Sequence, residues 1–321
     1  PPRSTLSSSS AASDVYKRQI MSHSGFNSYD VGVSWWSLDH HLGIRHSQLD
    51  SSLTGYGDLR RYNTIILPSG NPNLNDYSRN MLIDWVKQGG TLIANNRSTR
   101  SIISNDSFGS VKNLNATFDK SKSFNIDLMR EIYSMKENID ISDANNNQVN
   151  SEISYPWESS DVNYSKEQLQ MRDKWQSTLM PSGAIVSARV DNEHWLTFGA
   201  DDVVPVLYGN YPILMTGGNS QAALRIGELI PNENSVSKTI NWSQIPSGYD
   251  LNVRMSGLVW PEASQRIANS AYLTREKVGK GQIILFSGEP NFRGSARGTN
   301  RLWLNAVVYG SGLGTDSIVN P

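Results

Sequence analysis

The sequence predicts an α/β fold built on a parallel sheet, and three consecutive segments carry this prediction. Residues 62–67 (YNTIIL) form a short apolar run, which is typical of a strand buried on both faces. Apolar residues at helical spacing follow between Tyr77 and Val86, and Gly89 and Gly90 end the helix. A second apolar run, TLIA at 91–94, completes a βαβ unit, which is parallel and right-handed almost without exception.

The rest of the chain continues the pattern on both sides of this unit. A short first strand at 20–22, a helix over 33–42 and a strand over 44–49 precede it. A polar stretch, 113–180, is predicted to be an insertion that contains two helices, over 126–135 and 165–178. β structure follows, and the strongest signal is a hairpin that turns at Gly279 and leads into a helix. These later elements are expected at 184–190, 203–208, 213–216, 251–255, 271–276, 282–287 and, for the helix, 301–309.

The two ends of the chain differ from this α/β region. Residues 1–19 are rich in Ser and Ala, show no periodicity and lack the apolar run of a signal peptide. They are similar to translated adaptor sequence, so we expect them to be disordered and foreign to the natural protein. One domain is then predicted over 20–312, with a tail at 313–321. On this interpretation the chain is a fragment whose natural protein continues upstream.

Composition excludes several classes of protein. The 321 residues contain 29 Lys+Arg and 30 Asp+Glu, a formal net charge of −1, which argues against a nucleic-acid partner. No stretch approaches the roughly 18 apolar residues of a membrane span. The chain has no Cys, which excludes disulfides, Cys-ligated metals and a cysteine nucleophile.

Catalytic and metal-binding motifs are not found. A zinc peptidase site has a local His-x-x-Glu signature, and none of the five His is followed by Glu at that spacing. No Gly-x-Ser-x-Gly nucleophile motif and no phosphate-binding glycine loop occurs. We therefore predict no catalytic and no metal-ligating residue. A hydrolase whose Ser, His and Asp lie far apart in the sequence stays open as an alternative to the two functions given at the end of this section.

Two segments contain candidates for ligand binding or for contact with another domain. His194 and Trp195 follow a predicted strand and could line a polar pocket, although capping of the sheet with Trp195 packed inward is the favoured interpretation. Asp201 could join them, but adjacent carboxylates are usually just solvated. Arg293 follows the strongest predicted strand, at the edge where open sheets bind ligands, and could hold an anion or form an interdomain salt bridge.

Several motifs together resemble the C-terminal region of bacterial M14-family zinc carboxypeptidases. This region carries a class I glutamine-amidotransferase-like domain after the peptidase domain. The resemblance covers nearly all of residues 20–312. It rests on YDVGVSWWSLDHHLGI (29–44), DLRRYNTIILPSG (58–70), LIDWVKQGGTLIA (82–94), DNEHWLTFGADDVVPVLY (191–208), MSGLVWPE (255–262), AYLTREKVGKGQIILFSGEPNFRG (271–294) and GTNRLWLNAVVYG (298–310).

The resemblance implies a flavodoxin-like sheet with helices on both faces. A working amidotransferase would carry its Cys on the turn after a strand such as 91–94, where this chain has Asn95 and Asn96. It also implies that the zinc belongs to a peptidase domain upstream of Ile20, which would be the partner of this domain. The expected function is a non-catalytic accessory domain of a periplasmic or extracellular carboxypeptidase, with no cofactor of its own. The alternative is a module that binds a peptide or glycan ligand.

Overall fold

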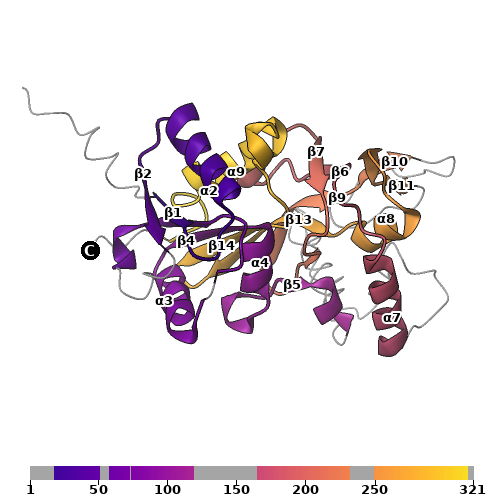
Figure 1. The fold of residues 1–321 in the computed structure, drawn as a ribbon, viewed down its shortest axis with the longest axis horizontal. Coiled ribbons are helices and arrows are strands. Elements are labelled where there is room, and N and C mark those ends of the chain that lie inside the picture. The colour runs from indigo at the N-terminus through magenta and orange to yellow at the C-terminus, as the bar shows by residue number, and fades with distance from the viewer. Residues whose placement is uncertain (1–17, 51–57, 73, 119–164, 232–248, 317–321) are drawn as a thin grey trace, which may run out of the picture.

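The computed structural model describes residues 18–50, 58–72, 74–118, 165–231 and 249–316. Most of its strands form a single mixed sheet, in the order β12-β6-β9-β13-β14-β4-β3-β1-β2. One part of this sheet is parallel and the other is antiparallel, and the β13–β14 hairpin joins them (Figure 1). We call these two parts the parallel half and the antiparallel half.

The parallel half has the strand order of a flavodoxin-like fold. Its neighbours are parallel throughout, in the order β2-β1-β3-β4-β14, which corresponds to the order 2-1-3-4-5. The predicted α/β fold class is therefore confirmed. The strands are β1 (Arg18–Ser22), β2 (His46–Asp50), β3 (Thr64–Leu67), β4 (Thr91–Asn95) and β14 (Gly281–Phe286).

The antiparallel half extends the same sheet through the second part of the chain. It comprises β13 (Ala271–Val278), β9 (Ser220–Ile226), β6 (Ala184–Val190), β12 (Arg254–Ser256) and β7 (Val203–Tyr208). The two-residue strands β8 (Leu214–Met215) and β5 (Lys112–Asn113) pair beside β13. A separate ribbon contains β10 (Glu228–Pro231) and β11 (Tyr249–Asn252).

Helices cover both faces of the parallel half (Figure 1). A hydrophobic core lies on each face of the sheet. Because successive side chains of a strand point to opposite faces, β4 contributes to both cores: Ile93 lies in the same cluster as Trp303, and Leu92 in the same cluster as Trp85. The first cluster belongs to the face of α2 (Ser28–Trp36) and α9 (Arg297–Tyr309). The second belongs to the face of α3 (Asp76–Lys87) and α4 (Asn96–Ile103).

The remaining helices lie mainly around the antiparallel half. α7 (Lys166–Ser177) packs against α8 (Pro261–Ile267) at one end of the molecule (Figure 1). Short helical turns complete the described chain. They are η1 (Ser37–His41), η3 (Leu59–Arg61), η4 (Asp106–Phe108), η5 (Leu114–Ala116), η7 (Trp195–Thr197) and η8 (Phe292–Gly294). Among the helices of the described ranges, none combines the length and apolar character needed to cross a bilayer.

The structure corrects several predicted boundaries. β1 starts at Arg18, not Ile20, because backbone pairing with both β2 and β3 holds Arg18 and the wholly buried Gln19 in the ladder. The helix expected at 33–42 begins at Ser28, where Asn27 caps it. α4, β9 and α8 were not predicted. The helix expected at 126–135 and the N-terminal residues 1–17 lie outside the described residues.

Candidate functional site

The turn from β4 into α4 is a sharp, left-handed elbow. Asn96, its first helical residue, has φ +46°, a conformation that Asn tolerates better than most residues. Thr99 Oγ1 lies 2.8 Å from both the Ala94 and Phe286 carbonyl oxygens, to either of which it can donate, and this pins the helix to β4 and β14. Ser98 Oγ donates to the Pro68 carbonyl beyond β3. The turn expected to carry a Cys in a working amidotransferase therefore exists, with Asn96 on it.

Two acidic side chains meet in front of this elbow. Glu289 follows β14, and its Oε1 accepts a hydrogen bond of 2.8 Å from Asn96 Nδ2. Asp30 lies in the first turn of α2 and hydrogen-bonds to Glu289. The Asn27 N–H donates to the Ser69 carbonyl at 2.9 Å, which anchors the start of α2 to the loop after β3. Three elements distant in sequence thus bring a carboxylate pair and an amide together.

Two tyrosine rings form the other side of the site. A Cβ placed on Gly288 would lie 2.9 Å from the Tyr211 ring and 3.1 Å from the Tyr272 ring, so only glycine fits between them. Ser287 Oγ donates to the Pro212 carbonyl at 2.7 Å and holds the Tyr211 loop against the end of β14. Asp30, Asn96, Tyr211 and Glu289, with Arg97 beside them, are called the elbow site below.

The electrostatics of the elbow site are those of a carboxylate pair short of positive charge. Burial, then the charge of Glu289 and its hydrogen bond, raise the pKa of Asp30 to about 7, although Arg97 opposes the shift. Burial and the charges of Glu289 and Asp30 also raise the pKa of Tyr211. Near neutral pH Asp30 is therefore only partly ionised, and Tyr211 stays neutral. Such a site accepts hydrogen bonds and positive charge, but it contains no thiol for amide transfer.

Trp195 begins η7 and His194 is its N-cap, away from the elbow. His194 Nδ1 accepts from the Leu196 N–H at 3.1 Å, and burial followed by the nearby Arg275 lowers the pKa of His194 to about 4. The ring of Trp195 stacks on His194 with 5.8 Å between centroids. The Asn305 amide donates to the Leu196 carbonyl at 2.9 Å, so η7 packs on the C-terminal part of α9.

The structure does not bring the four predicted residues to one place. Asp201 is exposed in the loop that follows η7, on the same side as His194 and Trp195. Arg293 lies on η8, which precedes the other end of α9 and packs against α2. Its φ is +50°, and its guanidinium lies 5.1 Å from the centroid of the Phe292 ring. Only Arg293 belongs to the edge of the sheet that carries the elbow site.

A dispersed hydrolase site needs a His that joins a Ser to a carboxylate. Ser22 Oγ lies 2.8 Å from His23 Nδ1 at the end of β1. Within the described ranges, however, no hydrogen bond or ion pair links His23 to a carboxylate. No group of three or more His, Asp or Glu in this part of the chain is placed to hold a metal ion.

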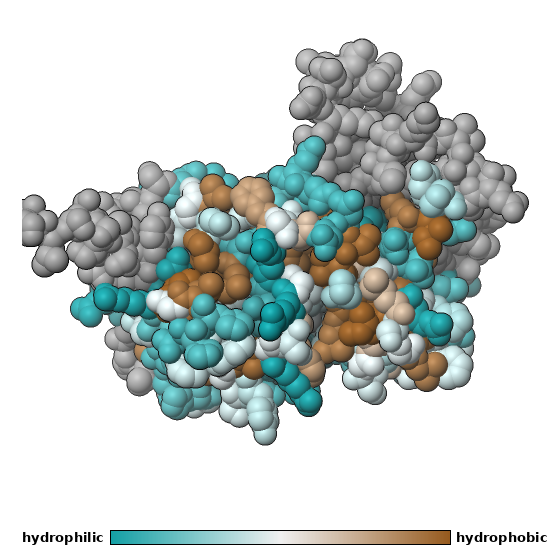
Figure 2. Space-filling model, turned by 90° about the horizontal axis from the view of Figure 1, so that it is seen from above, coloured by the Kyte–Doolittle hydropathy of each residue, from teal (hydrophilic) through white to brown (hydrophobic). Residues whose placement is uncertain are grey.

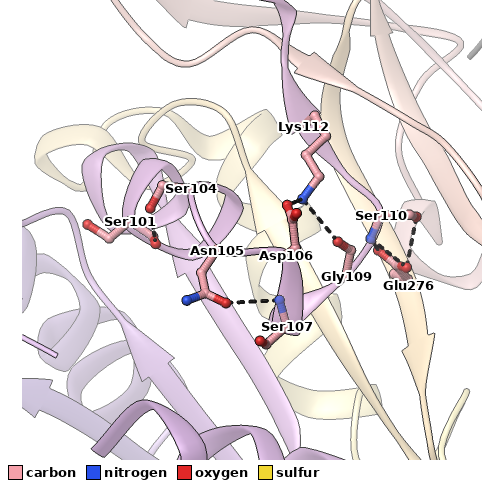
Figure 3. Close-up of polar contacts among 9 residues, drawn as sticks. All are labelled: Ser101, Ser104, Asn105, Asp106, Ser107, Gly109, Ser110, Lys112 and Glu276. Carbon is pink, nitrogen blue, oxygen red and sulfur yellow. Dashed lines mark hydrogen bonds and ion pairs between the residues drawn. The ribbon is translucent and has the colours of Figure 1, made fainter. Parts of the chain in front are cut away.

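A second buried carboxylate, that of Glu276 on β13, forms hydrogen bonds to the segment that contains Ser110 (Figure 3). Both its oxygens accept from the Ser110 N–H at 2.9 Å, and Ser110 Oγ donates to Oε1 at 2.8 Å. Glu276 borders a cavity of about 10 Å³ lined otherwise by the backbone of Gly109 and apolar side chains, room for about one water. Burial raises the pKa of Glu276 while Ser110 opposes the shift. We interpret this contact as a clamp that holds the segment after α4 against β13.

Comparisons with known proteins give structural likeness only. No family model and no curated protein matches the chain. A ThuA-like protein from Bacteroides uniformis is 12% identical over 94% of each chain, with a TM-score of 0.45. A ThuA-like protein from Parabacteroides merdae is 9% identical over 94% of this chain and 92% of its own, with a TM-score of 0.42. The chain spans 30% of a β-galactosidase from Bacillus circulans sp. alkalophilus, at 12% identity and a TM-score of 0.42.

Sequence reasoning missed most of the elbow site. Asn96 and Glu289 lay in segments already of interest, the turn after 91–94 and the segment that contains Arg293. An acid shortly after a buried strand and another in the first turn of a helix were usable signals for Glu289 and Asp30. Tyr211 gave no signal, because its place in the site depends on the packing of its loop against Gly288.

Proposed function

We propose that this chain is a non-catalytic domain that binds a small polar molecule at the elbow site. The observation that carries the proposal is the convergence of Asp30, Asn96, Tyr211 and Glu289 from four separate segments. They meet beyond the carboxyl ends of β4 and β14, the edge at which open α/β sheets bind ligands. The elbow geometry supports a binding role without a nucleophile, since the carboxamide of Asn96 cannot form a thiolate.

The side chains of the elbow site fit hydroxyl- or amine-bearing molecules. Carboxylate oxygens accept hydrogen bonds from such groups, and the Tyr211 ring offers a flat apolar face. These are also the features by which proteins hold sugars, which supports the glycan-binding form of the proposal. Arg293 lies on the same edge of the sheet, where it could contact an extension of the ligand.

Ligand-observed NMR tests this proposal directly. Saturation-transfer spectra are recorded for neutral monosaccharides, amino sugars, small amines and dipeptides with the wild-type protein, and positive compounds are repeated with Glu289→Gln and Asn96→Ala. We expect at least one compound to give a signal that both substitutions weaken. Glu193→Gln, an exposed acid in the distant η7 loop, is the matched control and keeps the signal. Binding that is equal in all four proteins would contradict the elbow site as its location.

A second proposal is the accessory role implied by the carboxypeptidase resemblance. One of the motifs that carry it, MSGLVWPE at 255–262, presents apolar side chains to solvent: Leu258 is 64% exposed and Trp260 is 50% exposed. Figure 2 shows that apolar side chains gather in several separate patches on the face seen there, divided by polar ones. We propose that the 255–262 segment docks on the peptidase domain of a periplasmic or extracellular M14-type carboxypeptidase. That peptidase domain would hold the zinc.

Calorimetry with a separately expressed M14-type peptidase domain tests the second proposal. We expect saturable binding that Leu258→Ser combined with Trp260→Ser abolishes. Tyr77→Ser, which removes an exposed aromatic from α3, is the matched control and leaves binding unchanged. Absence of binding by the wild-type chain to peptidase domains that naturally precede such a region would contradict the accessory role.

A further inference from the structure

We propose that the ligand of the elbow site carries an ammonium group, which binds between the carboxylates of Asp30 and Glu289 against the ring of Tyr211. This inference rests on the proposed binding function and specifies the chemical class of its ligand.

The first argument is charge balance. Asp30 hydrogen-bonds to Glu289, and burial together with the charge of Glu289 makes ionisation of Asp30 unfavourable while no cation is bound. Glu289 Oε1 already accepts from Asn96, and the exposed Arg97 only partly offsets the two acids. An ammonium group has three donors and one positive charge, so it can bond to both carboxylates and offset their charge. A neutral hydroxyl would leave the repulsion between the acids in place.

The second argument comes from Tyr272, whose ring, like that of Tyr211, lies against Gly288, the residue before Glu289. Its side chain is fully buried, and its hydroxyl has no hydrogen-bond partner within the described structure. Burial, followed by Tyr211 and the charge of Glu289, raises the pKa of Tyr272, so its hydroxyl stays protonated as a hydrogen-bond donor. A buried donor without an acceptor is costly, so it indicates a polar ligand atom or a ligand-bound water at this position.

The third argument separates an organic cation from a metal ion. A calcium ion takes six to eight oxygen ligands, whereas the described residues place only two carboxylates at the elbow. Tyr211 lies beside the pair with its ring against Gly288. Aromatic faces attract ammonium groups through the ring quadrupole and contribute nothing to the coordination shell of a hard metal ion. The elbow site therefore favours an amine.

A matched pair of sugars tests the ligand class. Titrations of 6-amino-6-deoxyglucose and of glucose into the full chain at pH 8 compare an ammonium with a hydroxyl on the same scaffold. We expect the amino sugar to bind at least tenfold more tightly than glucose. Asp30→Asn and Glu289→Gln should each remove this preference, and Glu193→Gln should retain it. Thermal unfolding of each variant verifies that it is folded, and either acid variant suffices if the other is not.

The outcomes separate the inference from the function on which it rests. Equal binding of the two sugars, with loss in Asn96→Ala, overturns the ammonium ligand and keeps the binding function. Displacement of the amino sugar by calcium chloride at similar concentration points to an inorganic cation and overturns the inference. If neither sugar binds, ethanolamine is titrated against ethylene glycol, and a lack of preference for the amine overturns the inference. Failure of every small molecule overturns the binding function as well.

Discussion

The two halves of the sheet differ in where their charged side chains lie. The antiparallel half buries cations: Arg189 and Arg225 are directly paired on β6 and β9, and Arg266 lies under α7. Backbone carbonyls, amides and Asp173 accept their hydrogen bonds, so these charges serve packing. The parallel half instead collects Asp30 and Glu289 in loops beyond the strand ends. No charged side chain of its described strands is buried, so the pair is not needed to balance a charge in the core and is available for a ligand.

The same contrast sets two opposite dependences of stability on pH. His194, on the antiparallel side, has a pKa of about 4 in the folded protein and 6.5 as its ordinary value. The contribution of His194 to the free energy of unfolding is fully present above pH 6.5 and is lost as the pH falls toward 4. Asp30 has a pKa of about 7 against an ordinary 3.8. The contribution of Asp30 to the free energy of unfolding is fully present below pH 3.8 and is lost as the pH rises through 7.

The largest effect is expected at the buried ion pair of the antiparallel half. Arg266 Nε and Asp173 Oδ1 lie 2.8 Å apart, with side chains 10% and 12% exposed. Arg266→Met leaves the Asp173 carboxylate buried without its partner, which costs about 3–5 kcal/mol of unfolding free energy. Urea denaturation measures the change. Arg60→Met, which breaks an exposed pair with Asp58 on the parallel side, is the matched control and leaves stability unchanged.

His194→Gln tests the acid-sensitive side of the comparison. The substitution keeps a hydrogen-bond acceptor but removes the titrating ring. Because the pKa of His194 shifts from 6.5 to about 4, wild-type stability should fall by up to roughly 3 kcal/mol between pH 6.5 and pH 4 through this residue. Unfolding free energies at half-unit pH steps should show a shallower slope in the variant. Parallel slopes would mean that His194 does not carry the acid sensitivity.

Gly288→Ala tests how tightly the elbow site is packed. The new methyl group would meet two rigid tyrosine rings at 2.9 and 3.1 Å, so one ring or the backbone must move. Overpacking of this kind costs about 1–3 kcal/mol. Thermal unfolding measures the loss, and any ligand found by NMR should bind more weakly. Gly183→Ala, whose Cβ would have no atom within 4 Å, is expected to be neutral.

The smallest effect is expected from Asp30→Asn. The variant and the wild type should have similar stability near pH 4, where Asp30 is protonated in the folded protein. Above pH 7 the variant should be the more stable of the two, since it has no charge to bury and none beside Glu289. Because Asp30 is only half-buried, solvent screening keeps the gain small. When Asp30→Asn is made in a Glu289→Gln protein, the gain in stability above pH 7 should be smaller. A gain of the same size would show that Glu289 does not cause it.

Local sequence signals were sufficient for much of the fold. β6, β7 and the hairpin of β13 and β14 lie where apolar runs and the turn at Gly279 predicted them. β9 was missed because its sequence, SQAALRI, mixes polar and small residues. It is a strand because β13 pairs with most of its length and the end of β6 pairs with its far end. α4 was missed because NRSTRSII has no helical apolar period, and its hydroxyl anchors to three strand ends hold it.

The sequence by itself determined the parallel βαβ core and the lack of any thiol at the elbow, since apolar patterning and residue identity are local properties. It also pointed to the edge of the sheet near Arg293. Only the tertiary structure decided which side chains share that edge. Asp30 and Glu289 lie near opposite ends of the chain, and they meet because β1 and β14 are in one parallel sheet with both carboxyl ends on the same side. No local pattern encodes that meeting, because strand order sets it.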